Sequence, residues 1–486
     1  MTNNIFKKYL PAACILGCLG FMAVSCTEAI EIGEVDESQY ANVGVLNGYL
    51  RDAGTGKSEN VIELRADDYR TDIVFGLTKT PGKGVDVTLS YDADYAQTYN
   101  ALHQTDYPLY PQELVEIEDN GRLVLAPDEK TSYELGIDIS YSDRLEDDRT
   151  YILPVKASSE TEGVNIAESA SHSVYLIKNY HSQSSAFKGD DAVKTFLFFE
   201  VNDTNPLNAL EFVLDNEEGS LFFDYVVLFA ANINYNAETG RVYVYCNPNV
   251  QFLLDHSEEY LQPLRKRGIK VLLGLLGNHD AAGLAQLSEA GAKDFARELA
   301  AICEAYNLDG VNFDDEYSDS PDLNNPLFAP KSTAAAARLC YETKKVMPDK
   351  DVTVFAYGYM YGTNVVDGVD ASEWIDIVVP NYGSSARPIG NLTVKQCAGF
   401  AAELNLMQYQ ASESSAQRVV SGGYGYYMLF ALYASDAATT NVTKRVSQVT
   451  SCSNVCRGLY GVPLKEVSYY YPKNSTEKVD INWISE

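Results

Sequence analysis

An acidic run from Asp309 to Glu316 holds the side chains whose spacing best suits catalysis, and it reads Asp-Gly-Val-Asn-Phe-Asp-Asp-Glu. Side chains two residues apart on a β-strand point to the same face, so Asn312, Asp314 and Glu316 would lie together. Two carboxyl groups about 7 Å apart on one strand face disfavour each other's ionisation, so the upper one can stay protonated near neutral pH. A protonated carboxyl group is what a general acid requires. The run therefore predicts acid–base chemistry.

Two interpretations of this pair stay open at the level of the residues. Asp-x-Glu is a common pattern, and the same carboxylates could bind a cation or lie solvated in a loop. A polar row inside a packed barrel is costly unless it serves a function or is fully hydrogen-bonded. The choice between a catalytic pair and a solvated or cation-binding loop therefore depends on the elements that carry Asp314 and Glu316.

Strands alternate with helices in the second part of the chain, which predicts an α/β fold of the (β/α)8 TIM-barrel type. Helices are expected at 249–267, 291–306 and 332–346, and a short strand at 241–246 is expected to form a hairpin with the second barrel strand. The eight expected barrel strands are 196–201, 225–234, 269–277, 310–316, 352–357, 375–382, 406–409 and 425–432. Catalytic residues of such barrels lie at the C-terminal ends of the strands, so Glu316 would lie at the mouth. Val311 and Phe313 would face the helix layer.

Residues 40–180 are expected to form an N-terminal all-β sandwich, because short segments with period-two alternation are separated by turn residues. Val85, Val87 and Leu89, for example, alternate with polar residues. We find no catalytic constellation there and expect an accessory or spacer domain. A Ser-rich stretch near residue 185 separates it from the barrel domain, which is assigned to residues 190–486.

The N-terminus resembles a lipoprotein signal. Two lysines precede a short apolar run that ends in small residues before Cys26. Residues 1–25 are expected to be removed, Cys26 to carry the lipid, and residues 26–39 to form an acidic tether. An ordinary signal peptide followed by a chance cysteine is the alternative. The expected location is the outer membrane, facing the cell surface, with membrane contact through the lipid anchor only.

Composition narrows the possible partners. The 37 Lys and Arg residues against 68 Asp and Glu residues give a formal charge of −31, so binding to nucleic acid is not expected. The 35 Tyr residues suit carbohydrate, because a phenol ring offers an apolar face with a polar tip.

The full acidic run resembles the Asp-Gly-x-x-x-Asp-x-Glu signature of family-18 glycoside hydrolases. Its ending, Phe-Asp-Asp-Glu-Tyr, resembles their endo-β-N-acetylglucosaminidase branch, although chitinases of the family carry Asp where this chain has Asn312. The segments at 229–235, 269–280, 380–383 and 422–429 are also similar to that branch, and the resemblance covers nearly all of residues 190–486.

The resemblance implies substrate-assisted retaining hydrolysis, in which the 2-acetamido group of the substrate is the nucleophile. It implies that Glu316 is the general acid and base, that Asp314 orients the acetamido group and stabilises positive charge, and that Tyr382 donates to the acetamido oxygen. Asn381 would help to position the sugar. No metal and no cofactor is required.

Other polar residues at predicted strand ends are candidates for glycan contact, with stabilisation of a loop or strand end as the alternative. They are Asn232, Asn234, Asn278, His279, Asp280 and Tyr317. Asp309 matches the motif, but its position favours a structural role.

The expected activity is hydrolysis of the GlcNAc-β1,4-GlcNAc core bond of N-linked glycans, of high-mannose or hybrid type. A chitinase-like hydrolase and a non-catalytic surface glycan-binding protein on the same barrel are the alternatives. The expected partners are N-glycans on glycoproteins and other surface proteins of glycan uptake.

Overall fold

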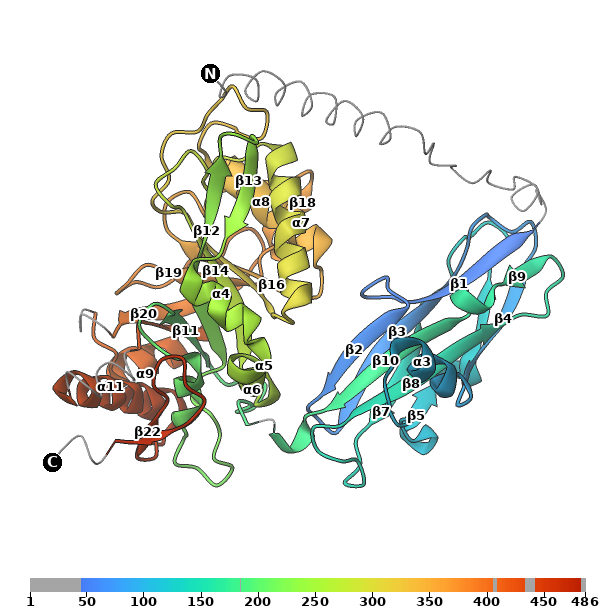
Figure 1. The fold of residues 1–486 in the computed structure, drawn as a ribbon, viewed down its shortest axis with the longest axis horizontal. Helices are drawn as coiled ribbons and strands as arrows, with labels where there is room; N and C mark the ends of the chain where they lie inside the picture. The colour runs from blue at the N-terminus through green and yellow to red at the C-terminus, as the bar shows by residue number, and fades with distance from the viewer. Residues whose placement is uncertain (1–44, 184, 405–408, 433–441, 482–486) are drawn as a thin grey trace, which may run out of the picture.

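Two regions with separate hydrophobic cores make up the described part of the chain (Figure 1). The computed structural model describes residues 45–183, 185–404, 409–432 and 442–481. An all-β region, blue to cyan in Figure 1, comes first, and an α/β region, green to red, follows it. The expected signal, Cys26 and the acidic tether lie outside the described residues.

The first region is a sandwich of two five-stranded sheets, with strand orders β5-β7-β3-β1-β9 and β2-β10-β8-β4-β6. Its elements are β1 Leu46–Asp52, β2 Glu59–Leu64, β3 Asp68–Leu77, β4 Val85–Tyr91, α3 Tyr95–His103, β5 Val115–Ile117, β6 Arg122–Leu125, β7 Leu135–Ser140, β8 Thr150–Ser158, β9 Val164–Ile166 and β10 His172–Asn179. The alternation predicted for β4 is confirmed, because Val85, Val87 and Leu89 are buried while the residues between them are exposed. These apolar side chains belong to the core between the sheets.

The second region is a barrel of eight parallel strands in the order β19-β16-β15-β14-β12-β11-β21-β20. The strands are β11 Lys194–Glu200, β12 Tyr225–Asn236, β14 Lys270–Leu276, β15 Gly310–Asp314, β16 Asp351–Ala356, β19 Ile377–Pro380, β20 Ala398–Glu403 and β21 Tyr426–Phe430. A parallel bridge between Val378 and Cys397 closes the ring. The hairpin partner of β12 is β13, Arg241–Tyr245, as predicted. The TIM barrel preceded by a β-sandwich is therefore confirmed.

The seventh barrel strand lies earlier in the chain than predicted. Residues 406–408 of the expected strand 406–409 lie outside the described residues, and the strand that pairs with β21 is Ala398–Glu403. Its sequence Ala-Gly-Phe-Ala-Ala-Glu is poor in β-branched residues, which are the residues that identify strands in a sequence.

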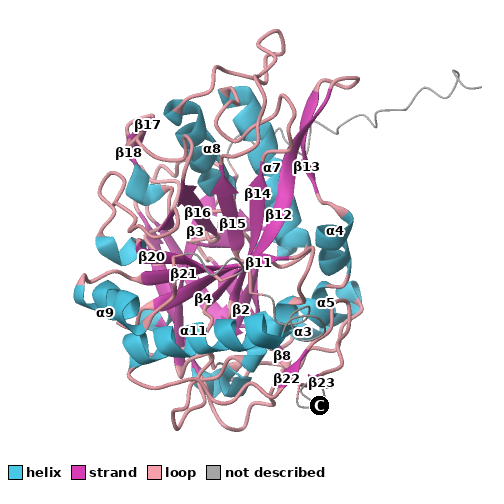
Figure 2. Cartoon of the chain, turned by 90° about the vertical axis from the view of Figure 1, so that its left-hand side faces the viewer, coloured by secondary structure: helices cyan, strands magenta, loops and turns pink. Residues whose placement is uncertain are grey.

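Helices surround the strands in Figure 2. They are α4 Pro248–Asp255, α5 Ser257–Tyr260, α6 Gln262–Lys266, α7 Glu289–Ala305, α8 Thr333–Val346, α9 Glu413–Ser421 and α11 Val442–Tyr460. The single helix predicted at 249–267 is wrong, because the chain breaks into α4, α5 and α6 there, and Pro263 at the start of α6 lacks the N–H that a continuous helix needs. Among the described residues, no helix is both long and apolar enough to cross a bilayer.

The ring of helices is incomplete. Between β11 and β12 the described chain forms the short 3-10 helix η5, Pro206–Glu211. Between β16 and β19 it forms a hairpin of β17, Val365–Val366, and β18, Val369–Asp370. A last hairpin, β22 Tyr469–Tyr470 with β23 Val479–Asp480, follows α11.

The side chains of β15 alternate between two cores. Val311 and Phe313 belong to the large core between the strands and the helices, as predicted. Asn312 is fully buried on the other face and donates to Thr353 Oγ1 at 2.8 Å. Asp314 has the same parity as Asn312, so β15 turns its carboxyl group toward the barrel interior.

Candidate active site

Asp314 is the last residue of β15, and its side chain lies deep in the barrel mouth. The residue is only 5% exposed, and its Oδ1 makes no hydrogen bond with the described part of the chain. Burial raises the pKa of Asp314 to about 8, and the neighbouring carboxylates Glu316 and Asp315 add to this rise. A neutral carboxyl group is therefore favoured at this position near neutral pH.

Glu316 lies one step further out, where the strand has ended. Its side chain is half-buried, and burial raises its pKa, although hydrogen bonding with Tyr317 acts in the opposite direction. We predicted that the upper carboxyl of the pair keeps a proton. The pKa values of both carboxyls are raised, so we assign the proton to the Asp314–Glu316 pair as a unit.

The backbone around Glu316 is fixed by the segment that follows β14. The Gly277 N–H donates to the Glu316 carbonyl oxygen at 3.1 Å, and the His279 N–H donates to the Tyr317 carbonyl at 2.6 Å. A Cβ atom on Gly277 would lie 2.2 Å from the Glu316 carbonyl oxygen. A glycine is therefore required at position 277 to let the two strand ends meet.

Tyr382 follows β19 and lies at the same mouth. Burial raises the pKa of its phenol, and the carboxylates Glu403, Asp314 and Glu316 contribute to the rise. Its ring packs 5.7 Å from that of Phe430 and 6.2 Å from that of Phe355, centroid to centroid. The phenol is thus held near the carboxyl pair as a neutral donor.

Several residues predicted to touch the glycan also hydrogen-bond within the protein, and their contact with a glycan stays a prediction. The Asn381 side chain accepts the Tyr382 N–H at 2.7 Å, and Asp280 accepts the N–H groups of Tyr235 and Ala282 at 2.9 and 2.7 Å. Asn232 donates to the Gly277 carbonyl oxygen at 3.1 Å. These bonds favour loop stabilisation for Asn232, Asp280 and Asn381.

The remaining candidates lie on the exposed rim. Asn278 donates to the side-chain oxygen of Asn234 at 3.0 Å, which ties the ends of β14 and β12 together. The rings of His279 and Tyr317 lie 5.3 Å apart, and Tyr317 is 54% exposed. Contact of these four residues with a glycan stays a prediction.

Sequence reasoning missed two carboxylates at the mouth. Glu200 ends β11 and Glu403 ends β20, and both raise the pKa of Tyr382. Burial also raises the pKa of Glu200. Glu200 has the parity of the inward-facing Phe196 and Phe198, so this alternation could have revealed it.

Exposed tyrosines that follow the C-terminal ends of barrel strands were also missed. Tyr357, Tyr359 and Tyr361 follow β16 and are 41%, 41% and 52% exposed, respectively. Tyr409 stacks on Tyr382 with the ring centroids 6.4 Å apart. Aromatic side chains with polar tips offer sugar rings both an apolar face and hydrogen-bond partners.

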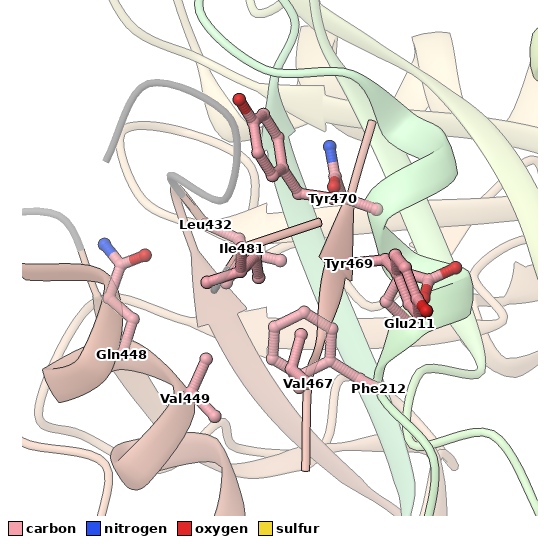
Figure 3. A pocket seen from close by; sticks show the side chains of 10 residues that line it. Glu211, Phe212, Leu432, Gln448, Val449, Val467, Tyr469, Tyr470 and Ile481 are labelled. Atoms are coloured by element: carbon pink, nitrogen blue, oxygen red, sulfur yellow. The ribbon is translucent and has the colours of Figure 1, made fainter. Parts of the chain in front are cut away.

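Figure 3 shows a different pocket, lined mainly by apolar side chains from η5, α11 and the C-terminal hairpin. Its lining includes Phe212, Leu432, Val449, Val467 and Ile481 and none of the candidate catalytic residues. Within the described residues, no group of three or more His, Cys, Asp or Glu side chains is arranged to hold a metal ion. The carboxyl pair and Tyr382 therefore define the candidate active site.

Comparison with known proteins identifies relatives of this chain. A family model for an N-terminal domain matches residues 41–164. The chain is 44% identical over 286 residues to endo-beta-N-acetylglucosaminidase F1 of Elizabethkingia meningoseptica, an alignment that covers 58% of this chain and 82% of that protein. It is 32% identical over 244 residues to an endo-beta-N-acetylglucosaminidase of a Flavobacterium strain, covering 50% of this chain and 76% of that protein.

Among solved structures, the chain is similar to EndoBT-3987 of Bacteroides thetaiotamicron in complex with a Man5GlcNAc product. The identity is 50% and the TM-score 0.62, and the match covers 89% of this chain and 99% of that one. A second structure of that protein, with a Man9GlcNAc2Asn substrate, matches with the same TM-score and coverage at 48% identity.

The named relatives make this chain a glycoside hydrolase, and its parallel barrel with a carboxyl pair at the C-terminal end of the fourth strand fits that class. Its sequence relatives specify the group further. The chain belongs to the endo-β-N-acetylglucosaminidases of glycoside hydrolase family 18.

Proposed function

We propose that this protein hydrolyses the GlcNAc-β1,4-GlcNAc core bond of N-linked glycans of high-mannose or hybrid type and leaves one GlcNAc on the glycoprotein. The observation that carries the proposal is the buried carboxyl Asp314, with a pKa raised to about 8, beside Glu316 at the barrel mouth. The Man5GlcNAc product and the Man9GlcNAc2Asn substrate in the EndoBT-3987 structures support high-mannose glycans as the substrate class.

Glu316 is the general acid in this proposal. Its carboxyl group protonates the glycosidic oxygen, and the C1–O bond breaks as the leaving GlcNAc departs with that proton. The resulting carboxylate then takes a proton from the water that attacks C1 in the second step. The half-buried position of Glu316 suits both steps, because burial keeps the proton on the acid while the open side admits water.

The nucleophile is the acetamido carbonyl oxygen of the substrate, which attacks C1 and closes a five-membered ring. Asp314 accepts the acetamido N–H, and as an anion it stabilises the positive charge of that ring. The proton of the pair then resides on Glu316, where the leaving group needs it. Tyr382, kept neutral by its raised pKa, donates to the acetamido oxygen and holds it below C1.

Intact-mass analysis of a high-mannose glycoprotein tests this proposal. Incubation with the wild type should leave the glycoprotein with a single GlcNAc at each processed site, and Glu316→Gln should leave its mass unchanged over the same time. Glu304→Gln is a suitable control, because Glu304 is an exposed residue of α7. Equal cleavage by Glu316→Gln would refute the assigned acid.

We also propose that the protein is attached to the outer membrane through a lipid on Cys26 and faces the cell surface. The support is the sequence alone, in which small residues precede Cys26 after a short apolar run. In fractionated cells, the wild type should remain with the membranes, and a Cys26→Ser variant should not be lipidated. Membrane attachment of the variant at wild-type level would contradict the proposal.

A further inference from the structure

Asp315 lies between the two catalytic carboxyls in the sequence but makes its contacts with other segments. It is 3% exposed, and its Oδ2 accepts the backbone N–H of Tyr359 at 3.1 Å. Its Oδ1 faces Lys331, whose Nζ lies 3.8 Å away in another segment. The carboxylate of Asp315 thus joins β15 to two other segments of the chain.

One of these segments is the tyrosine loop, which we define as residues 357–361 after β16. Gly358 has a φ of +55°, and a Cβ atom there would lie 2.4 Å from the Asp315 carbonyl oxygen and 2.7 Å from its Oδ2. The loop therefore packs directly on Asp315. It presents Tyr357, Tyr359 and Tyr361 to solvent at the catalytic end of the barrel.

Lys331 completes the arrangement from the segment before α8. Its Nζ lies 3.8 Å from Asp315 Oδ1 and 5.6 Å from the centroid of the Tyr359 ring. The same cation thus faces the carboxylate and one of the exposed rings. The hydrogen bond from the Tyr359 N–H to the Asp315 carboxylate is charge-assisted and therefore stronger than a neutral one, so it restrains the loop more than an uncharged turn would.

We propose that Asp315 is a positioning residue, which holds the tyrosine loop in the geometry that binds the glycan. This inference rests on the proposed function, because the loop matters only if the barrel mouth takes a glycan. Asp315 holds the loop through the hydrogen bond from the Tyr359 N–H and through the ion pair with Lys331, whose ammonium group also faces the Tyr359 ring. Loss of the carboxylate should therefore weaken substrate binding more than it slows bond cleavage.

The test combines hydrogen exchange without substrate and steady-state kinetics with a high-mannose glycopeptide. Asp315→Ala should remove the protection of peptides that cover residues 357–361 and raise KM about tenfold, with a smaller change in kcat. Asp315→Asn keeps an acceptor oxygen for the Tyr359 N–H. Its loop protection and its KM should therefore lie between those of Asp315→Ala and those of the wild type.

Asp376→Asn is the matched control. Asp376 also pairs with a lysine, Lys344, at 2.9 Å and accepts a backbone N–H of β16, that of Val352, at 2.7 Å. These contacts lie at the opposite end of β16 from the tyrosine loop. The control should lower thermal stability with KM and loop protection unchanged.

Unchanged loop protection or unchanged KM in Asp315→Ala would overturn the positioning role. Equal KM increases in Asp315→Ala and Asp376→Asn would overturn it as well, since a general loss of stability would then explain both. Failure of the proposed function gives a different result. In that case the wild type itself would not cleave the glycopeptide, while the hydrogen-exchange result would still report on the contact.

Discussion

The two ends of β15 hold the same kind of residue in opposite environments. At the base, Asp309 receives two hydrogen bonds of 2.8 Å from Arg265 and one of 2.8 Å from the Val271 N–H. These partners lower its pKa. At the mouth, burial raises the pKa of Asp314 to about 8, and the neighbouring carboxylates Glu316 and Asp315 add to this rise. At the base, Arg265 balances the negative charge of Asp309. At the mouth, where chemistry is proposed, the carboxyl pair keeps a proton.

The base of the strand is also connected to the sandwich. Arg265, which is 4% exposed, extends a third bond of 2.8 Å to Glu63 of β2. The ion-pair network at the base therefore crosses between the two regions. The matching residue types at the two ends show that a motif aspartate alone does not identify a catalytic group, because its partners decide its protonation.

The largest expected effect concerns the acid itself. Glu316→Gln should lower kcat for a high-mannose glycopeptide about a thousandfold, because a positioned general acid contributes effects of that order. The loss should be much smaller with a substrate in which a nitrophenyl group replaces the leaving GlcNAc, because the nitrophenolate needs no protonation. Comparing the two substrates checks the role. Equal losses on both substrates would assign Glu316 to something other than proton donation.

Asp314→Asn should lower kcat about a hundredfold, since the amide cannot carry the negative charge that stabilises the ring intermediate. The same change should raise thermal stability at neutral pH. The pKa of Asp314 is higher in the folded protein than in the unfolded chain, so this carboxyl costs stability as pH rises from its unfolded pKa toward about 8. Kinetics measure the change in kcat, and calorimetry measures the change in thermal stability. An Asp314→Asn variant that is less stable than the wild type at neutral pH would contradict the raised pKa of Asp314.

Asp309→Asn tests the base of the strand. The substitution should lower the free energy of unfolding by about 2 kcal/mol, because a hydrogen-bonded ion pair with the buried Arg265 is lost. The pKa of Asp309 is lowered in the fold, so its contribution is present above the unfolded pKa and is lost as the pH falls through the folded value. Denaturant titration gives the change. If the folded Asp309→Asn variant lost kcat a hundredfold, Asp309 at the base would matter to catalysis as much as Asp314 at the mouth, which would contradict the comparison.

The smallest expected effect is that of the phenol. Tyr382→Phe keeps the ring contacts with Phe355 and Phe430 and removes one donor to the acetamido oxygen. One hydrogen bond contributes about 1.4 kcal/mol, so its loss should lower kcat about tenfold. Steady-state kinetics measure it, and a variant with wild-type kcat would exclude Tyr382 from the reaction.

Local alternation was sufficient to predict much of this site. Val311 and Phe313 alternate with Asn312 and Asp314 over a short strand, so the inward face of β15 could be predicted from the sequence. Glu403 could not be found in this way, because the small residues of β20 carry no clear strand signal. The motif match marked Tyr382 but said nothing of its packing.

Contacts between segments distant in the sequence were beyond such reasoning. Asp315 and Tyr359 are 44 residues apart, as are Arg265 and Asp309. Asp315 meets Tyr359 because the barrel brings the C-terminal ends of β15 and β16 together, and Arg265 of α6 meets Asp309 at the start of β15. No local pattern encodes either meeting. The sequence predicted a structural role for Asp309 and a catalytic role for Asp314, whereas the role proposed for Asp315 depends on partners that only the fold brings near it.

The pH dependence of kcat/KM tests the central claim most directly, because it reports the ionisation of the free enzyme. The pair at the mouth should keep its proton up to about pH 8, so kcat/KM should fall above that pH. The kcat/KM of the Asp309→Asn variant should fall at the same pH as that of the wild type. A profile that stays level from about pH 7 to about pH 10, with the protein still folded, would contradict the account.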